Sequence, residues 1–113
     1  MHELAVIEGI IETMTEVAAA NRLSRISRLD LVIGKMHQLV PDMLEFSFET
    51  CTQGTVAEKC KLVIDWRPVI VTCRDCSNRS EIIDSIFICP HCGSFRLNTE
   101  SGKELYIKSI TGE

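Results

Sequence analysis

The chain has 113 residues, enough for one compact domain or for a small core with a smaller module attached. Its 12 basic and 16 acidic residues give a formal net charge of −4, the wrong sign for neutralising nucleic-acid phosphates, so no nucleic-acid partner is expected. Acidic residues interrupt every apolar run well before the roughly 20 residues that span a bilayer, and no basic segment of a secretory signal precedes them. We therefore expect a cytoplasmic protein without membrane association.

Residues 3–20 carry apolar side chains at helical spacing, which predicts an amphipathic helix. The apolar residues of its predicted buried stripe are Leu4, Ile7, Ile11, Met14 and Ala18. The segment RLDLVIG then alternates apolar and polar residues and ends at Gly34, which predicts a strand. Pro41 and Asp42 suit the first turn of a second helix, and Gly54 is expected to end it.

The segment CKLVIDW alternates again and predicts a second strand, with a boundary at Pro68. Residues 70–102 differ in character, because they combine two pairs of cysteines with small polar residues and one short apolar run. They are predicted to form an inserted module. The segment KELYIKSI alternates once more and is expected to return to the first core as a third strand.

The inserted module contains two Cys-x-x-Cys pairs, Cys73 with Cys76 and Cys89 with Cys92, separated by 12 residues. This spacing is typical of a structural zinc site with four thiolates, in which each pair makes a tight turn and the residues between them a hairpin. Buried free thiols or a redox dithiol are alternatives. Iron is another, because CPHCG resembles a rubredoxin knuckle, although CRDCS lacks the matching glycine. A module with so few apolar side chains needs the metal, whose binding contributes on the order of 10 kcal/mol.

These elements predict an α+β fold: a small three-stranded sheet with two helices, plus an inserted zinc-ribbon domain. The first domain is expected to comprise residues 1–69, completed by a strand at 103–113. The zinc-ribbon domain is expected to comprise residues 70–102.

The sequence begins with MHEL, which places an imidazole beside a free α-amine. One metal ion can then bind the amine of Met1, backbone amide nitrogen and the imidazole of His2 as fused chelate rings, and Glu3 can add its amide nitrogen or carboxylate. Such a nitrogen-rich planar set favours Ni(II) or Cu(II) over Zn(II). These residues alone, however, favour an ordinary solvated terminus, because a histidine at position 2 often occurs by chance.

The whole chain resembles a known family. The segments MHELAVIEGIIE and GKMHQLVPDMLEFSFE, followed by CRDC and CPHCG, are similar in this order to the hydrogenase nickel-incorporation protein family, HypA/HybF, over essentially all 113 residues. The resemblance implies that His2 binds nickel, and Glu3 matches the same motif. It also implies that a structural zinc is held by Cys73, Cys76, Cys89 and Cys92.

The resemblance further implies a nickel metallochaperone that serves the large subunit of NiFe hydrogenase, works with the HypB GTPase and in some members supplies urease. No nucleophile with a base at recognisable spacing and no glycine-rich phosphate loop is found in the sequence, so we expect no enzyme. The alternative is a zinc-ribbon adaptor without a second metal, acting in transcription or complex assembly. Monomer and homodimer both stay open.

Four further residues of metal-binding type are expected to have ordinary roles. His37 lies in a predicted turn, where facing the metal is the alternative, but it is expected to face the solvent. His91 lies inside the second knuckle, where replacing a cysteine as ligand is the alternative, but the turn is expected to point its middle residues outward. Cys51 and Cys60 are expected to pack as small apolar side chains.

Overall fold

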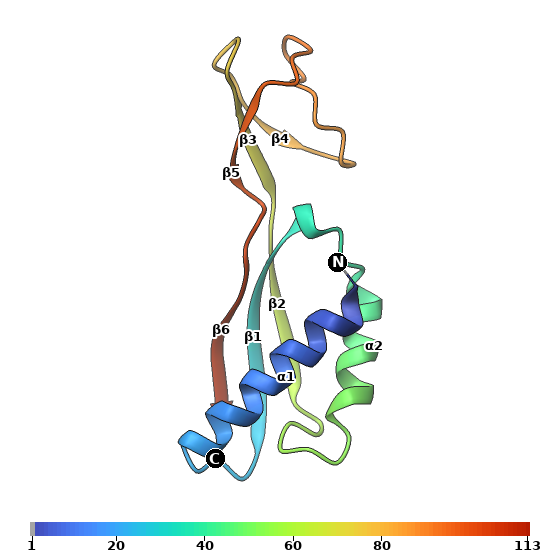
Figure 1. Ribbon diagram of the computed structural model, residues 1–113, viewed down its shortest axis with the longest axis vertical. Coiled ribbons are helices and arrows are strands. Elements are labelled where there is room, and N and C mark those ends of the chain that lie inside the picture. Colours follow the sequence, from blue (N-terminus) through green and yellow to red (C-terminus); the bar gives the residue numbers. More distant parts are fainter. Residues whose placement is uncertain (1) are drawn as a thin grey trace. The chain divides into compact units, whose positions relative to one another are not determined.

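The computed structural model describes residues 2–113, so the predicted nickel ligand Met1 lies outside the described residues. In order, the elements are α1 (Glu3–Ala20), β1 (Ile26–Gly34), the short 3-10 helix η1 (Lys35–His37), α2 (Pro41–Thr52), β2 (Lys61–Arg67), β3 (Val69–Cys73), β4 (Arg79–Ile82), β5 (Leu97–Ser101) and β6 (Leu105–Gly112). The strands form two three-stranded sheets with the orders β2-β1-β6 and β4-β3-β5 (Figure 1). The predicted α+β fold is confirmed, and the inserted part has a sheet of its own where a hairpin was expected.

The chain divides into two compact units. The first unit contains α1, α2 and most of β1, β2 and β6, whereas the second unit contains Ile33–His37 and Trp66–Leu105. The predicted domains, 1–69 with 103–113 and 70–102, stay a prediction, because compactness does not show what each unit binds. Of the helices within residues 2–113, none has both the length and the apolar character needed to cross a membrane.

In the first unit, α1 crosses the strands of the sheet and packs against α2 (Figure 1). The buried residues of α1 are Val6, Ile7, Met14 and Ala18. The predicted stripe is therefore wrong at Leu4, which is 50% exposed. Successive helix residues are about 100° apart, so Leu4 and Val6 project about 200° apart and a helix that buries Val6 turns Leu4 to the solvent.

The central strand of the first sheet is β1, and its alternation is confirmed. Leu29, Leu31 and Ile33 are at most 2% exposed. Val32 is also fully buried, although it points to the other face of the strand. A central strand has neighbours on both sides, so their side chains can cover it on both faces.

The second unit is built around β3, which pairs antiparallel with both β4 and β5. Its buried apolar cluster consists of only three residues, Val69, Val71 and Ile82, with Met36 and Leu97 packed against it. So small a core cannot offset the conformational entropy of ordering the whole unit. The fold of the second unit therefore needs a further source of stability.

Within the second unit, two glycines allow two backbone segments to meet. The N–H of Gly34 donates to the carbonyl oxygen of Glu104 at 2.7 Å, and the N–H of Met36 donates to that of Gly102 at 3.0 Å. A Cβ atom on Gly34 would lie 1.9 Å from the carbonyl oxygen of Gly102. Gly102 itself has a φ of +117°, and a Cβ there would lie 2.8 Å from Val69. No side chain fits at this contact.

Replacing Gly34 with alanine is expected to lower the free energy of unfolding by about 3 kcal/mol, because the clash is with backbone atoms that cannot rotate away. The control is Gly9→Ala in α1, where a Cβ meets nothing within 4 Å. That change is expected to stabilise the protein by about 0.5–1 kcal/mol, since alanine favours a helix interior. Denaturant unfolding followed by circular dichroism measures both, and equal stability of the two variants would contradict this packing.

Candidate metal centres

The four cysteines of the two pairs converge on one point in the second unit. Their Sγ atoms all lie within 4.8 Å of one another, with 3.6 Å between Cys73 and Cys92 and 3.6 Å between Cys76 and Cys89. A tetrahedral site with Zn–S bonds of about 2.3 Å places its sulfur atoms about 3.8 Å apart. The donor set and its spacing therefore fit a four-thiolate zinc site.

Each pair lies in a turn that local hydrogen bonds close. In the first knuckle, the N–H of Ser77 donates to the carbonyl oxygen of Cys73 at 3.0 Å. The N–H of Cys73 donates in turn to the carbonyl oxygen of Asn78 at 2.9 Å. These two hydrogen bonds hold the backbone on both sides of the sulfur ligands.

The second knuckle repeats both hydrogen bonds, from Gly93 to Cys89 at 2.9 Å and from Cys89 to Ser94 at 2.8 Å. Gly93 has a φ of +78°, and Ser77, at the matching position of the first knuckle, has a φ of +64°. The missing glycine of CRDCS therefore does not change the shape of its turn. Ser77 instead adopts a left-handed conformation that is costly for a residue with a side chain.

The sulfur atoms differ in how readily they lose a proton. Backbone N–H groups of Cys76 and Asp75 lower the pKa of Cys73 to about 6. At Cys92 the N–H of Ser94 lowers the pKa, but the sulfur of Cys73, desolvation and the other two sulfurs together raise it to about 12. Four thiols this close cannot all ionise unless a cation compensates their charge, so the cluster suits a divalent metal ion.

Polar side chains join the two knuckles around the sulfur cluster. Asp75, in the first knuckle, accepts a hydrogen bond from the hydroxyl of Ser94 in the second. Arg96 approaches the other carboxylate oxygen of Asp75 at 3.4 Å. This link across the cluster was not predicted, since nothing in the spacing of these residues indicates that they meet.

The remaining cysteines and His91 lie outside this cluster. His91 is exposed, and Cys51 and Cys60 are half-buried. Burial raises the pKa of the Cys60 thiol, which makes it a poorer metal ligand. Among the described residues, the four clustered cysteines form the only group of three or more ligating side chains whose donor atoms converge.

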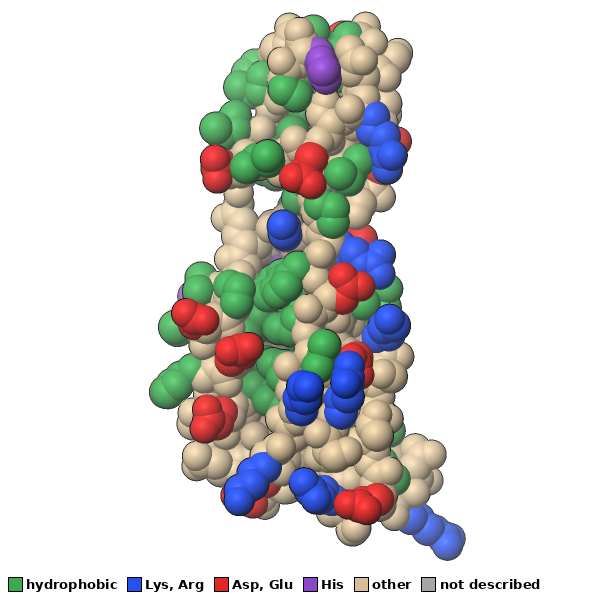
Figure 2. All heavy atoms as spheres, turned by 180° about the vertical axis from the view of Figure 1, so that it is seen from behind, with side chains coloured by type: hydrophobic (Ala, Val, Ile, Leu, Met, Phe, Trp, Pro, Cys, Tyr) green, Lys and Arg blue, Asp and Glu red, His purple; other side chains and the backbone are tan. Residues whose placement is uncertain are grey.

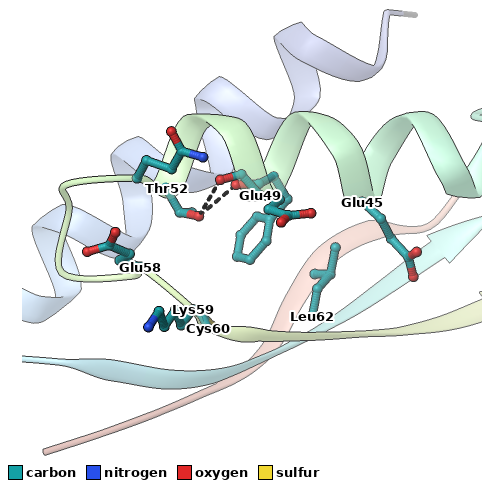
Figure 3. A pocket seen from close by; sticks show the side chains of 9 residues that line it. Glu45, Glu49, Thr52, Glu58, Lys59, Cys60 and Leu62 are labelled. Atoms are coloured by element: carbon teal, nitrogen blue, oxygen red, sulfur yellow. Dashed lines mark hydrogen bonds between the residues drawn. The ribbon is translucent and has the colours of Figure 1, made fainter.

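An open cavity of about 410 Å³ lies in the first unit, along α2 and the start of β2. Three carboxylates, those of Glu45, Glu49 and Glu58, lie on its walls, and Figure 3 shows Glu45 and Glu58 at opposite ends. The hydroxyl of Thr52 is turned to the backbone of α2, where it donates to the carbonyl oxygen of Phe48 at 2.7 Å. Among the described residues, the acidic side chains of this cavity do not converge into a metal-binding group.

The predicted nickel residues lie where α1 begins. His2 is exposed, is the N-cap residue of α1 with extended backbone, and makes no side-chain capping hydrogen bond. The carboxylate of Glu3 accepts a hydrogen bond from the N–H of Val40 at 2.9 Å. That N–H group is the main cause of a lowered pKa of Glu3. Glu3 thus connects the first residue of α1 to the N-cap residue of α2.

His37 is partly exposed and also makes a contact that was not predicted. Its Nε2 atom lies 2.9 Å from the carbonyl oxygen of Lys103, and the residue is half-buried. A carbonyl only accepts, so Nε2 carries the proton. The partner is 66 positions away in the sequence, and no local pattern indicates such a contact.

Replacing Cys92 with serine is expected to remove most of the bound zinc and to make the second unit sensitive to protease, because metal binding on the order of 10 kcal/mol is lost. Cys60→Ser is the control, because Cys60 lies outside the cluster. This variant is expected to keep one zinc ion per chain. Elemental analysis and limited proteolysis measure both effects. A Cys92→Ser protein with full zinc and the protease resistance of the parent would show that the cluster is not the metal site.

This chain is similar to known proteins over its whole length. The family described as hydrogenase/urease nickel incorporation, metallochaperone, hypA matches residues 1–112. The hydrogenase maturation factor HypA of Moorella thermoacetica is 37% identical over 113 residues, which cover 100% of both chains. The hydrogenase maturation factor HybF of Salmonella typhimurium is 36% identical, again with 100% of both chains covered.

Two solved structures are also similar to this chain. The solution structure of the Ni metallochaperone HypA from Helicobacter pylori matches 99% of this chain and 97% of its own, with a TM-score of 0.67 and 25% sequence identity. A second solution structure of a HypA protein matches with a TM-score of 0.69 and 25% identity over 100% of this chain. The chain therefore belongs to the HypA/HybF family of hydrogenase maturation factors.

Proposed function

We propose that this chain is a nickel metallochaperone that binds Ni(II) at its N-terminus through His2 and delivers it for the maturation of NiFe hydrogenase. The observation that carries the proposal is the position of His2, exposed at the N-cap of α1 with its imidazole free of any capping bond. Membership of the family supports the same function. Urease is a second possible client of the delivered nickel.

The start of a helix suits this kind of site. The first N–H groups of an α-helix have no partner within the helix, so replacing the amide proton of Glu3 by a metal breaks no helical hydrogen bond. The imidazole of His2 and the amine of Met1 complete the chelate that we propose. We propose that Glu3 contributes through its backbone nitrogen, while one oxygen of its carboxylate accepts from Val40.

The cysteine centre has a different role in this proposal. A zinc ion bound by Cys73, Cys76, Cys89 and Cys92 has no vacant position for another ligand, so it stabilises structure and is not the metal that is delivered. The nickel site has few anchors and faces the solvent, so ligands of another protein can replace them one at a time. In this proposal, zinc stabilises the fold and nickel is the metal that is transferred.

The proposal includes the HypB GTPase and the hydrogenase large subunit as partners, a cytoplasmic location, where thiols stay reduced, and no catalytic activity. It includes no nucleic-acid partner. Basic and acidic side chains are interspersed over the face seen in Figure 2, and four arginines pair with carboxylates. Such a surface offers no continuous basic patch on that face for phosphates.

His2→Ala, and separately one extra residue placed before Met1, are each expected to abolish nickel binding while leaving zinc unchanged. The first removes the imidazole, and the second moves the free amine out of the chelate. His91→Ala is the control, because His91 is equally exposed but lies in the zinc knuckle. Isothermal titration measures nickel binding by the parent and by each variant, and the zinc content is measured in parallel. Tight nickel binding by the extended chain would exclude the amine as a ligand.

Glu3→Gln is expected to weaken nickel binding by less than about tenfold, or about 1.4 kcal/mol, because glutamine keeps the backbone nitrogen and an oxygen that can accept from Val40. Glu3→Pro is the counterpart, because proline has no N–H to replace at the helix start, where it is otherwise tolerated. It is expected to abolish nickel binding. The same titration measures both, and loss of binding in Glu3→Gln alone would identify the carboxylate as the ligand.

A further inference from the structure

The sulfur atoms of the first knuckle receive hydrogen bonds of two kinds. Cys73 accepts from the backbone N–H of Asp75, with 3.4 Å between nitrogen and sulfur. Cys76 accepts from a side chain, the amide Nδ2 of Asn78, also at 3.4 Å. A side-chain donor can be altered by mutation without changing the backbone, so its effect on the metal centre can be measured.

The turn places Asn78 for this contact. Its carbonyl oxygen accepts the N–H of Cys73 at 2.9 Å, which fixes its backbone beside the sulfur cluster. Its short side chain then reaches back two residues, and its amide donates to the sulfur of Cys76. At the matching position of the second knuckle, the hydroxyl of Ser94 donates to Asp75 instead. The two knuckles therefore differ in the side chain that faces the metal ligands.

We propose that Asn78 is a positioning residue for the metal centre: its amide holds the Cys76 thiolate in place as a ligand and reduces its reactivity towards electrophiles. The proposal rests on the four cysteines holding zinc. A hydrogen bond to a thiolate draws electron density from the sulfur, which makes it a weaker nucleophile. Partners of this kind around metal ligands typically change metal affinity by about 10- to 100-fold when they are removed.

Asn78→Asp tests this most sharply, because the ionised carboxylate has the same shape, donates no hydrogen bond and brings negative charge to the sulfur. Asn98→Asp is the matched control. Asn98 lies on β5 and accepts from Arg74 at 2.7 Å, a role that aspartate retains. Asn98→Asp therefore adds the same charge without removing a hydrogen bond to a sulfur atom. Asn78→Ala removes the donor without adding charge.

Zinc affinity of the full chain is measured by competition with a coloured chelator, and the modification of each cysteine by N-ethylmaleimide is followed by peptide mass spectrometry. We expect about tenfold weaker zinc binding in Asn78→Ala, a larger loss in Asn78→Asp and none in Asn98→Asp. Cys76 should become the first cysteine modified in both Asn78 variants.

Parental zinc affinity in both Asn78 variants would overturn the proposal. So would equal modification of all four cysteines, which would show that Asn78 only maintains the turn. Absence of zinc from the parent protein would overturn the four-cysteine metal centre itself, and the role of Asn78 with it. Unequal zinc binding by parent and Asn78 variants, with Cys76 modified first, supports both.

Discussion

The convergence of four cysteine sulfur atoms is the constraint on which the second unit depends, because thiolates this close repel one another unless a cation compensates their charge. The buried apolar cluster there consists of Val69, Val71 and Ile82, too little to order the segment from Trp66 to Leu105. Several apolar side chains of the unit even face the solvent, among them Phe95, which is 77% exposed. We therefore expect metal–thiolate bonds, more than hydrophobic burial, to stabilise this half of the chain.

The first unit is stabilised in the opposite way, by an aliphatic core between two helices and a sheet. Because this core stabilises the unit, the residues at its helix ends remain available to bind ligands. His2 lies at the exposed start of α1, and Glu3 holds that start against the N-cap residue of α2 through a single hydrogen bond to Val40. In the function that we propose, the start of this helix presents nitrogen donors to a metal that is released, while the closed thiolate cluster keeps its own metal.

In the knuckles, the spacing of the cysteines indicates the turn, whereas the side chains around the sulfur atoms depend on individual residues. Both turns make the same two backbone hydrogen bonds, although one has Gly93 and the other Ser77 at the left-handed position. A spacing of two residues between cysteines is enough to specify such a turn, and this is why the cysteine pairs could be recognised without any structure. The side chains that surround the sulfur atoms could not be recognised in this way. Asn78 and Asp75 have their roles only because the turns bring them to the cluster.

What the sequence by itself determined is the part of the structure that depends on short separations: the helices, the alternating strand that buries Leu29, Leu31 and Ile33, and the two cysteine turns. Periodicity and turn chemistry act within a few residues, so they can be seen in the sequence. Tertiary structure alone decided that α1 buries Val6 and exposes Leu4, and that His37 meets the backbone of Lys103, 66 positions away. It also decided that Gly34 must lack a side chain because of Gly102. Such contacts arise from the packing of distant segments, whose approach no local pattern encodes.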